Sequence, residues 1–526
     1  MIYLMNKKEN AKGEKMNKNG IPHRIHKFKA RILDFEAGKN IAILNEDDAI
    51  YNDIYVLDRM SIKYKSKEVI AIIDLSKTMV KKGEIAIYKD IADQLKIKNG
   101  EDVEIQHIPT PKSLEYIKKK MDKETLKENE IYSIIQETLE NRLSEGELAS
   151  FVAAAYINGF GISETVALSK AMVDTGKTLD LNVHPIADKH CIGGVAGNRT
   201  TMLIVPILAA AGIYIPKTSS RAISSASGTA DTFEVLAPVV LPIDELRQVV
   251  LKTKGCIAWG GAINLAPVDD KLIRIRNSLH LDPKGLLLAS ILAKKKAVGA
   301  EYLVVDIPVG RGAKIEDENE GKMLANDFLQ ISEQLGIKTR CLITDGSDPI
   351  GFGVGPGLEV LEVYKSLTLK DGGELREKSC LMAGSILELV GKAPPGKGAE
   401  IAFNLVKNGK AFAKLKEIIE AQGGNPNFKE SDIPIGKYVY EVRAEKSGRV
   451  SHVDNRYVNK IARVAGAPKD KGAGVRLHCE KGDKVNEGDV LYEIIAESES
   501  KLSFAIKMAE AIPPIELQKV IIGKIE

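Results

Sequence analysis

Residues 300–310 read "AEYLVVDIPVG", an apolar run of strand-forming residues that ends on a glycine. Further apolar runs, "TTMLIVPILAAAGI" at 200–213 and "TRCLITDG" at 339–346, belong to the same region, in which strand-like and helical patterns alternate. Such alternation indicates a sheet covered by helices. The stretch therefore predicts a large α/β domain, and we expect its sheet to be mixed.

The pattern changes on both sides of this region. Short β-rich runs separated by turn residues precede it, then a helical period begins near Leu114, and short strands with Gly and Asp turns return toward the C-terminus. The lysine-rich opening has too few apolar residues for a signal peptide. We therefore expect a flexible extension or misassigned start at 1–26, a β-rich, barrel-like module at 27–110, an α domain at 111–178 and 264–298, a central α/β domain at 179–263 and 299–432, and a small C-terminal α/β domain at 433–526.

Two helix starts are predicted in the α domain. Ser144 and Glu147 have the spacing of a capping box at the head of "ELASFVAAAYINGF". Ser163 is expected to cap the following helix, which should stop at Gly176.

Composition limits the class of ligand. The chain has 526 residues, 44% of them hydrophobic and 28% charged, with a net charge of only +3, so several folded domains are expected and no large basic field indicates nucleic acid or membrane. The five cysteines form no C-x-x-C pair, which argues against a zinc ribbon or a disulfide framework. We expect a cytoplasmic protein with a small-molecule ligand.

Three segments could bind an anion. In "DKHCIGGVAGNRTTMLIVP", at 188–206, glycines before an apolar helix could turn backbone N–H groups toward a negative charge. In "KTSSRAISSASGTADTFE", at 217–234, short hydroxyls surround Arg221, whose guanidinium can bind phosphate bidentately. In "DIPVGRGAK", at 306–314, Lys314 follows a strand end, where ligands of open α/β sheets bind.

Each segment also has a structural interpretation: a tight turn for the glycines, a surface Ser/Thr turn around Arg221, and a solvated loop for Lys314. His190 could be an acid or a hydrogen-bonded structural residue. We read Cys191 as structural, and "GFGVGPG" at 351–357 as a close-packed turn.

In order and spacing, "DKHCIGGV", "SSRAISSASGTADTFE" and "SILAKK" at 290–295 together resemble the thymidine and pyrimidine-nucleoside phosphorylase family. The likeness runs from about residue 112 to the C-terminus. It implies an α domain and a large α/β domain hinged around a cleft, a small C-terminal domain, and a pentosyltransferase that cleaves an N-glycosidic bond with phosphate.

Four departures from the usual family pattern indicate one branch. Cys191 replaces a serine, "SSRAISSASGT" replaces a glycine-rich run, Lys314 stands where the family tends to have an apolar residue, and a β module is added at the N-terminus. These features look like the archaeal AMP phosphorylase branch, which acts on nucleoside 5′-monophosphates. A nucleotide brings a second phosphate, which an added lysine and extra hydroxyls could bind.

The resemblance to this branch implies the site residues. Asp282 matches its general acid. Lys189, His190, Arg276 and Lys294 correspond to residues that contact phosphate and base in the nucleoside enzymes. The residues implied to bind the nucleotide are Gly194, Ser220, Arg221, Ala222, Ile223, Ser224, Ser225, Thr229, Ser290 and Lys314.

The implied reaction is attack of phosphate on C1′ of AMP, giving adenine and α-D-ribose 1,5-bisphosphate, with CMP and UMP as further substrates. Asp282 must then carry a proton near neutral pH, which apolar surroundings formed by Leu279, Leu281 and residues 286–288 would favour. No metal or other cofactor is expected, and the partners expected are AMP, inorganic phosphate and further copies of the chain in a homodimer or a higher oligomer. The N-terminal module is expected to drive assembly beyond a dimer.

Two alternatives remain at this point. The first is a thymidine or pyrimidine-nucleoside phosphorylase. The second is a non-catalytic nucleotide-binding or carrier protein, although the loop at 469–471 lacks the Met-Lys-Met setting of a modified carrier lysine.

Overall fold

The computed structural model describes residues 15–16, 22–23, 25–36, 38–223, 225–263, 265–371 and 373–518. Most of the extension expected at 1–26 lies outside these residues. The chain forms two units, one of residues up to 160 with 271–284, the other of 161–270 with the chain from 285 onward. The domain boundaries expected from the sequence stay a prediction.

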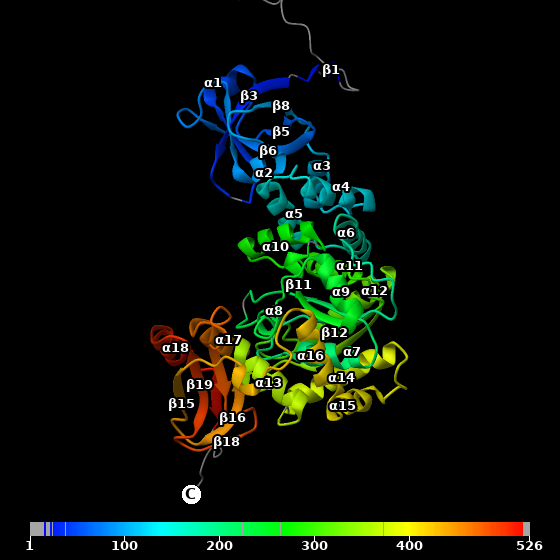
Figure 1. The fold of residues 1–526 in the computed structure, drawn as a ribbon, viewed down its shortest axis with the longest axis vertical. Coiled ribbons are helices and arrows are strands. Elements are labelled where there is room, and N and C mark those ends of the chain that lie inside the picture. Colours follow the sequence, from blue (N-terminus) through cyan, green and yellow to red (C-terminus); the bar gives the residue numbers. More distant parts are fainter. Residues whose placement is uncertain are drawn as a thin grey trace, which may run out of the picture. The chain divides into compact units, whose positions relative to one another are not determined.

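The first unit begins with a closed barrel, drawn in blue in Figure 1. Isoleucines of alternate strand positions, among them Ile62, Ile73, Ile85 and Ile105, are fully buried inside it. The barrel-like module expected from the sequence is confirmed. Its strands are, in spatial order, β3 (Ile25–Leu33), β7 (Glu84–Tyr88), β4 (Ile41–Asn45), β6 (Lys67–Ser76), β5 (Arg59–Tyr64) and β8 (Asp102–His107), with helices α1 (Glu46–Tyr51) and α2 (Lys89–Leu95) in the connections, and β1 (Lys15–Met16) pairs with β2 (Pro22–His23).

Helices complete the first unit: α3 (Ser113–Met121), α4 (Glu128–Leu139), α5 (Glu145–Asn158) and the part of α10 (Pro267–Leu279) from Lys271 onward. The predicted capping box of α5 is confirmed, because the Ser144 hydroxyl accepts from the Glu147 N–H. Lys271 ties the returning segment to α4 by donating to the Thr138 carbonyl over 2.8 Å.

The predicted cap of the next helix is wrong. Helix α6 (Ile162–Asp174) has Gly161 at its N-cap, and Ser163 lies inside its first turn. The Glu164 carboxylate accepts from the Gly161 N–H over 2.9 Å, so the first turn is satisfied without a serine hydroxyl.

The second unit is built on parallel strands. Strands β9 (Ala187–Cys191), β12 (Tyr302–Val309) and β13 (Lys338–Asp345) form one sheet in the order β13-β12-β9, and β10 (Ile215–Ser219) pairs with β11 (Gly255–Trp259). A single parallel bridge between Ile186 and Tyr214 joins the two sets. The sequence predicted a mixed sheet here, but all these strands pair in parallel.

Helices cover both faces of this sheet, as the run at 300–310 predicted. Val304 of β12 packs into the core formed with α7, α14 and α16, whereas Leu303 and Val305 face the core formed with α11 and α12. A strand buried on both faces is a continuous apolar run. The helices are α7 (Thr200–Ala210), α9 (Ile243–Thr253), α11 (Lys284–Ala297), α12 (Glu318–Gln334), α13 (Pro356–Thr368), α14 (Gly373–Leu389), α15 (Gly398–Lys407) and α16 (Lys410–Ala421).

A C-terminal module, orange to red in Figure 1, closes the second unit. Its strands are β15 (Tyr438–Arg443), β16 (Gly448–Val453), β17 (Gly474–Leu477), β18 (Lys484–Val485), β19 (Val490–Ala496) and β20 (Ile515–Gln518), and its helices α17 (Asn455–Val464) and α18 (Glu499–Ala511). Strand β14 (Gly353–Val354) of the preceding chain joins its sheet through β17.

A buried ion pair connects several of these elements. Arg199 is 8% and Glu359 1% exposed, and the Arg199 Nη2 lies 2.8 Å from a Glu359 carboxylate oxygen. The same carboxylate accepts from the Thr232 hydroxyl, and Arg199 also donates to the Ser227 carbonyl over 2.6 Å. Glu359 starts α13 behind the "GFGVGPG" segment, where a Cβ on Gly355 would lie 2.3 Å from the Ala473 carbonyl oxygen. The prediction of a close-packed turn is confirmed.

We expect Glu359→Leu to destabilise the second unit by about 3–5 kcal/mol, because the Arg199 guanidinium would stay buried without a counter-charge. Differential scanning calorimetry would record a lower melting temperature. As a control, Arg199→Met/Glu359→Leu should regain most of the loss, since apolar side chains of similar volume can replace a buried pair. A single variant that melts with the wild type would contradict this role of the ion pair.

Candidate active site

The glycine loop (residues 192–199) connects β9 to α7. Gly193, Gly194 and Gly197 have φ values of 91°, 97° and 69°, which side chains disfavour. A Cβ on Gly194 would lie 2.5 Å from the backbone nitrogen of Lys314. Two of the predicted residues, Gly194 and Lys314, therefore lie together at the carboxyl ends of β9 and β12, where ligands of parallel sheets bind.

The serine loop (residues 220–228) connects β10 to α8 (Thr229–Phe233). It contains the predicted residues 220–223 and 225, and Thr229 follows as the first residue of α8, while Ser224 lies outside the described residues. Asp231 closes the loop, because its Oδ2 accepts from the N–H groups of Ala222 at 2.6 Å and Gly228 at 3.0 Å. Asp231 was missing from the predicted residues, although its spacing after Gly228 in "SGTAD" could have indicated it.

Arg221 contacts carboxylates in this structure. Its guanidinium lies 3.0 Å from Asp231 and 2.8 Å from Glu234, and stacks 5.1 Å from the ring centroid of Trp259. The hydrogen bond from Arg221, with further help from Lys471, lowers the pKa of Glu234 to about 2. The phosphate contact expected of Arg221 stays a prediction.

Two buried aspartates lie under the loops, and each holds lysines. Asp188 of β9 is 2.7 Å from Lys295 and 3.4 Å from Lys217. Burial alone would raise the pKa of Asp188, but Lys217 and Lys295 outweigh it and the pKa is lowered. Burial also lowers the pKa of Lys217, and the nearby Lys295 adds to that effect.

Asp306 of β12 is the second aspartate. It lies 3.9 Å from Lys189 and 3.5 Å from Lys378, and accepts from the Thr344 hydroxyl over 2.7 Å. Lys189 also donates to the hydroxyl of Thr200, the first residue of α7, over 2.8 Å. Four lysines therefore share two aspartates. This lysine cluster (Lys189, Lys217, Lys295 and Lys378) has more positive than negative charge, which suits an anionic ligand.

Sequence reasoning found only one member of the cluster, Lys189. Asp306 and Lys217 lie inside buried strands. Because unpaired charges are rarely buried, a charged residue within an apolar strand could have indicated that a cluster of opposite charges lies there.

His190 follows Lys189 at the end of β9. Burial, then the neighbouring Lys295, Lys217, Lys189 and Lys314, lower the pKa of His190 well below its usual value. A neutral imidazole can form hydrogen bonds with an anion but is a poor proton donor at neutral pH.

Cys191 is protonated rather than nucleophilic. Burial and the nearby Asp306 raise the pKa of its thiol to about 11. This agrees with the structural reading of Cys191, since the thiolate is the reactive form.

Ser290 and Lys294 of α11 meet at one carboxylate. The Ser290 hydroxyl donates to Asp269 over 2.6 Å, and Lys294 Nζ lies 2.8 Å from the same oxygen. Asp269 is only 1% exposed and was not predicted. Asp269 lies at the start of α10, in "PVDD", where acidic residues are common because they interact favourably with the helix dipole. Its position therefore did not mark it as a site residue.

Asp282, the predicted acid, belongs to the first unit. Arg276 is its ion-pair partner, and the side chain of Asp282 is 42% exposed. Leu279 is also 40% exposed. The prediction of apolar surroundings for Asp282 is therefore wrong. A general acid must hold its proton until it acts, whereas an arginine pairs with the ionised form of a carboxyl group.

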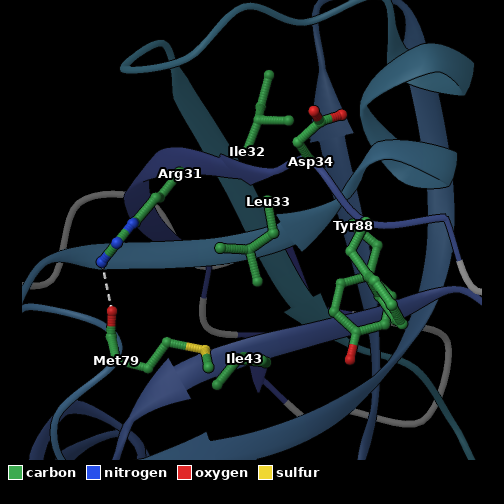
Figure 2. A pocket seen from close by; sticks show the side chains of 8 residues that line it. Arg31, Ile32, Leu33, Asp34, Ile43, Met79 and Tyr88 are labelled. Carbon is green, nitrogen blue, oxygen red and sulfur yellow. Dashed lines mark hydrogen bonds between the residues drawn. The ribbon is translucent and has the colours of Figure 1, made fainter.

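The barrel of the first unit has a solvent-open pocket that is separate from the two loops and the lysine cluster (Figure 2). The Arg31 guanidinium reaches the Met79 carbonyl across its rim, and the Tyr88 ring packs edge-on against Phe35 with centroids 5.2 Å apart. None of the residues predicted for the site lines this pocket, whose walls are Arg31, Ile32, Leu33, Asp34, Phe35, Ile43, Met79 and Tyr88.

Comparisons with known proteins agree with this architecture. Residues 114–176 match the helical bundle domain and residues 183–412 the a/b domain of the glycosyl transferase family, and residues 449–516 match the pyrimidine nucleoside phosphorylase C-terminal domain. A solved anthranilate phosphoribosyltransferase from Thermus thermophilus covers 58% of this chain and 98% of its own at a TM-score of 0.51 and 19% identity, which supports the fold alone. The class is thus a glycosyl transferase with a nucleoside-phosphorylase C-terminal domain.

The full-length relatives narrow this class. AMP phosphorylases from Pyrococcus furiosus and Thermococcus kodakarensis are each 46% identical over 95% of this chain and 99% of their own. The AMP phosphorylase of Methanocaldococcus jannaschii is 44% identical over the same shares. The chain belongs to the AMP phosphorylase family. The resemblance predicted from the sequence is confirmed, and so is the fold class apart from the mixed sheet. Within the described residues, we find no helix with the length and apolarity to cross a bilayer.

We expect Gly194→Ala to lower the melting temperature more than Gly193→Ala. Both substitutions place a side chain at positive φ, but only the Gly194 methyl would meet the Lys314 backbone, whereas a Cβ at Gly193 has nothing within 4 Å. Overpacking of this kind costs about 1–3 kcal/mol, which calorimetry on the two variants would resolve. Equal shifts would mean that the contact with Lys314 adjusts freely.

Proposed function

We propose that this protein catalyses the phosphorolysis of AMP, and also of CMP and UMP, to the free base and α-D-ribose 1,5-bisphosphate. The observation that carries the proposal is the similarity to AMP phosphorylases along 95% of the chain. The lysine cluster beneath the glycine loop and the serine loop supports the proposal, because the reaction brings two phosphate groups into one site. The reaction makes the protein a pentosyltransferase of nucleotide degradation.

In this proposal the two loops take different groups. The serine loop and Lys314 hold the 5′-phosphate of the nucleotide, and Ser290 contacts the nucleoside. Lys189 and neutral His190, at the end of β9, hold the attacking phosphate. Hydroxyls, N–H groups and lysines fixed in advance need little reorganisation when charge moves at the sugar.

Asp282 protonates the base in this proposal. Phosphate attacks C1′ from the face opposite the base, the N-glycosidic bond breaks, and a proton must reach a ring nitrogen so that the base leaves neutral. Because Asp282 pairs with Arg276 in this structure, the proposal requires Arg276 to leave the carboxyl group before the proton is transferred. Closure of the protein around both anions would exclude water at that stage.

Location and assembly follow the same proposal. AMP and phosphate are metabolites of the cytoplasm, so we place the protein there. We also propose a homodimer or a larger homo-oligomer, with the barrel as the module that extends assembly.

One experiment tests the reaction and the role of Lys314 together. The wild type should release ribose 1,5-bisphosphate from AMP and phosphate, and should split thymidine and adenosine poorly. Lys314→Met should lower kcat/KM for AMP about 10- to 100-fold, because a hydrogen bond from a charged donor is lost, and leave the residual adenosine reaction unchanged. Lys322→Met, which removes an exposed lysine of α12, is the control. Readier cleavage of thymidine than of AMP would favour the pyrimidine-nucleoside alternative, and equal losses for AMP and adenosine would remove Lys314 from the 5′-phosphate.

The acid is tested separately. We expect Asp282→Asn to lower kcat for AMP about 10²–10⁴-fold, the usual contribution of general acid catalysis, with KM for AMP changed less than about threefold. Steady-state kinetics measure both values. Asp244→Asn, at an exposed carboxylate of α9, controls for the loss of a negative charge. Unchanged turnover would show that another group protonates the base.

A further inference from the structure

Helix α17 of the C-terminal module presents three polar side chains, each one turn apart, to the backbone of the candidate site. They are Asn455, Asn459 and Arg463, and this spacing puts them on one face of the helix. Their partners lie more than 100 residues earlier in the chain. All of these contacts are within the second unit.

Asn455 holds the glycine loop. It is fully buried, its Oδ1 accepts from the Ala196 N–H at 2.8 Å, and its Nδ2 donates to the carbonyls of Gly346 at 2.9 Å and Ser347 at 3.2 Å. One side chain therefore fixes both the loop after β9 and the loop after β13.

Asn459 holds the serine loop in the same manner. Its Oδ1 accepts from the Ala226 N–H at 2.8 Å, while its Nδ2 is fixed by the Asn455 carbonyl at 2.8 Å. Ala226 and Ala196 are 0% and 2% exposed and belong to the same apolar core as Val458 of α17. Each loop thus inserts a methyl group into the C-terminal module and has the adjacent N–H bound by an asparagine.

Arg463 holds the outer part of the serine loop. Its Nη1 donates to the carbonyl of Ile223 at 2.6 Å and to that of Ser225 at 3.2 Å. Ile223 and Ser225 both belong to the stretch that the sequence assigned to the nucleotide. On the inner side of the same loop, Asp231 binds the Ala222 and Gly228 N–H groups.

We infer that α17 is the positioning element of the nucleotide site, with Asn459 and Arg463 fixing the serine loop and Asn455 the glycine loop. The inference rests on the proposed function. A loop of small residues loses much conformational freedom when it is ordered, so a loop ordered beforehand binds its ligand more tightly. Loss of Asn459 therefore weakens AMP binding, while Lys189 and the glycine loop keep their affinity for inorganic phosphate.

The test compares Asn459→Leu with Asn459→Asp. Leucine has a similar volume but leaves the buried Ala226 N–H without an acceptor, and such a loss typically corresponds to about a tenfold change in an equilibrium. We expect KM for AMP to rise about tenfold, with kcat and KM for phosphate within about twofold. Aspartate retains the acceptor oxygen for the Ala226 N–H but loses the donor to the Asn455 carbonyl, so it should restore part of the loss in KM for AMP. Lys460→Ala, on the exposed side of α17, is the matched control and should behave as the wild type.

A second variant and a measurement that does not depend on catalysis distinguish the expected effect from misfolding of the variant. Arg463→Met alters an exposed residue and should also raise KM for AMP but not KM for phosphate. Hydrogen exchange of the peptide 217–234 should be faster in both Asn459→Leu and Arg463→Met, and AMP should slow it.

The outcomes separate this inference from the proposed function. If the wild type does not cleave AMP, the proposed function fails, but faster exchange of the serine loop in the variants would still support α17 as its positioning element. If the wild type cleaves AMP and both variants match Lys460→Ala in KM and in exchange, the inference is overturned. Parallel losses of kcat and of affinity for both substrates, not restored by Asn459→Asp, would also overturn it, since they indicate general unfolding.

Discussion

The second unit depends on two aspartates buried in adjacent parallel strands. Asp188 and Asp306 are both 0% exposed, and a buried carboxylate is tolerated only when it is paired. The lysines that pair with them come from β9, β10, α11 and α14, so the same contacts bind the sheet to the helices and gather positive charge under the loops. In this arrangement the same side chains pair the buried carboxylates and give the strand ends their positive charge.

Different chain segments contribute different groups to the candidate site. The sheet and its helices supply the charges, the two loops supply N–H groups and hydroxyls, and the C-terminal module fixes those loops. The buried pair of Arg199 and Glu359 adds a second restraint on the serine loop through the Ser227 carbonyl. A loop rich in serine and glycine has little tendency to hold one shape alone, so restraints on both sides are needed.

Local patterns predicted the elements well and the long-range contacts poorly. The apolar run at 300–310, the capping box at Ser144 and the barrel follow from residue periodicity, which acts over a few positions. The parallel pairing of all central strands depends on neighbours that the periodicity does not contain. The glycine cap of α6 and the pairing of Asp282 with Arg276 join residues only three and six positions apart, so some local contacts were missed as well. The assignment of Gly194 and Lys314 to the site stays a prediction of the resemblance, and their mutual contact depends on two strand ends meeting. Asp269 was missed because it resembles an ordinary first-turn acidic residue. Lys217, Lys295 and Lys378 were missed because only the fold brings them to Asp188 and Asp306.

The closed barrel at the head of the chain has a consequence for recognition. Each of its six strands has two neighbours, although β3 and β6 pair with theirs over different halves, so none of the six is free along its whole length for a strand from outside to add to. A protein that docks on these six strands would therefore recognise them mainly through side chains, such as those around Phe35 and Met79. Its selectivity would change with point substitutions rather than with strand register.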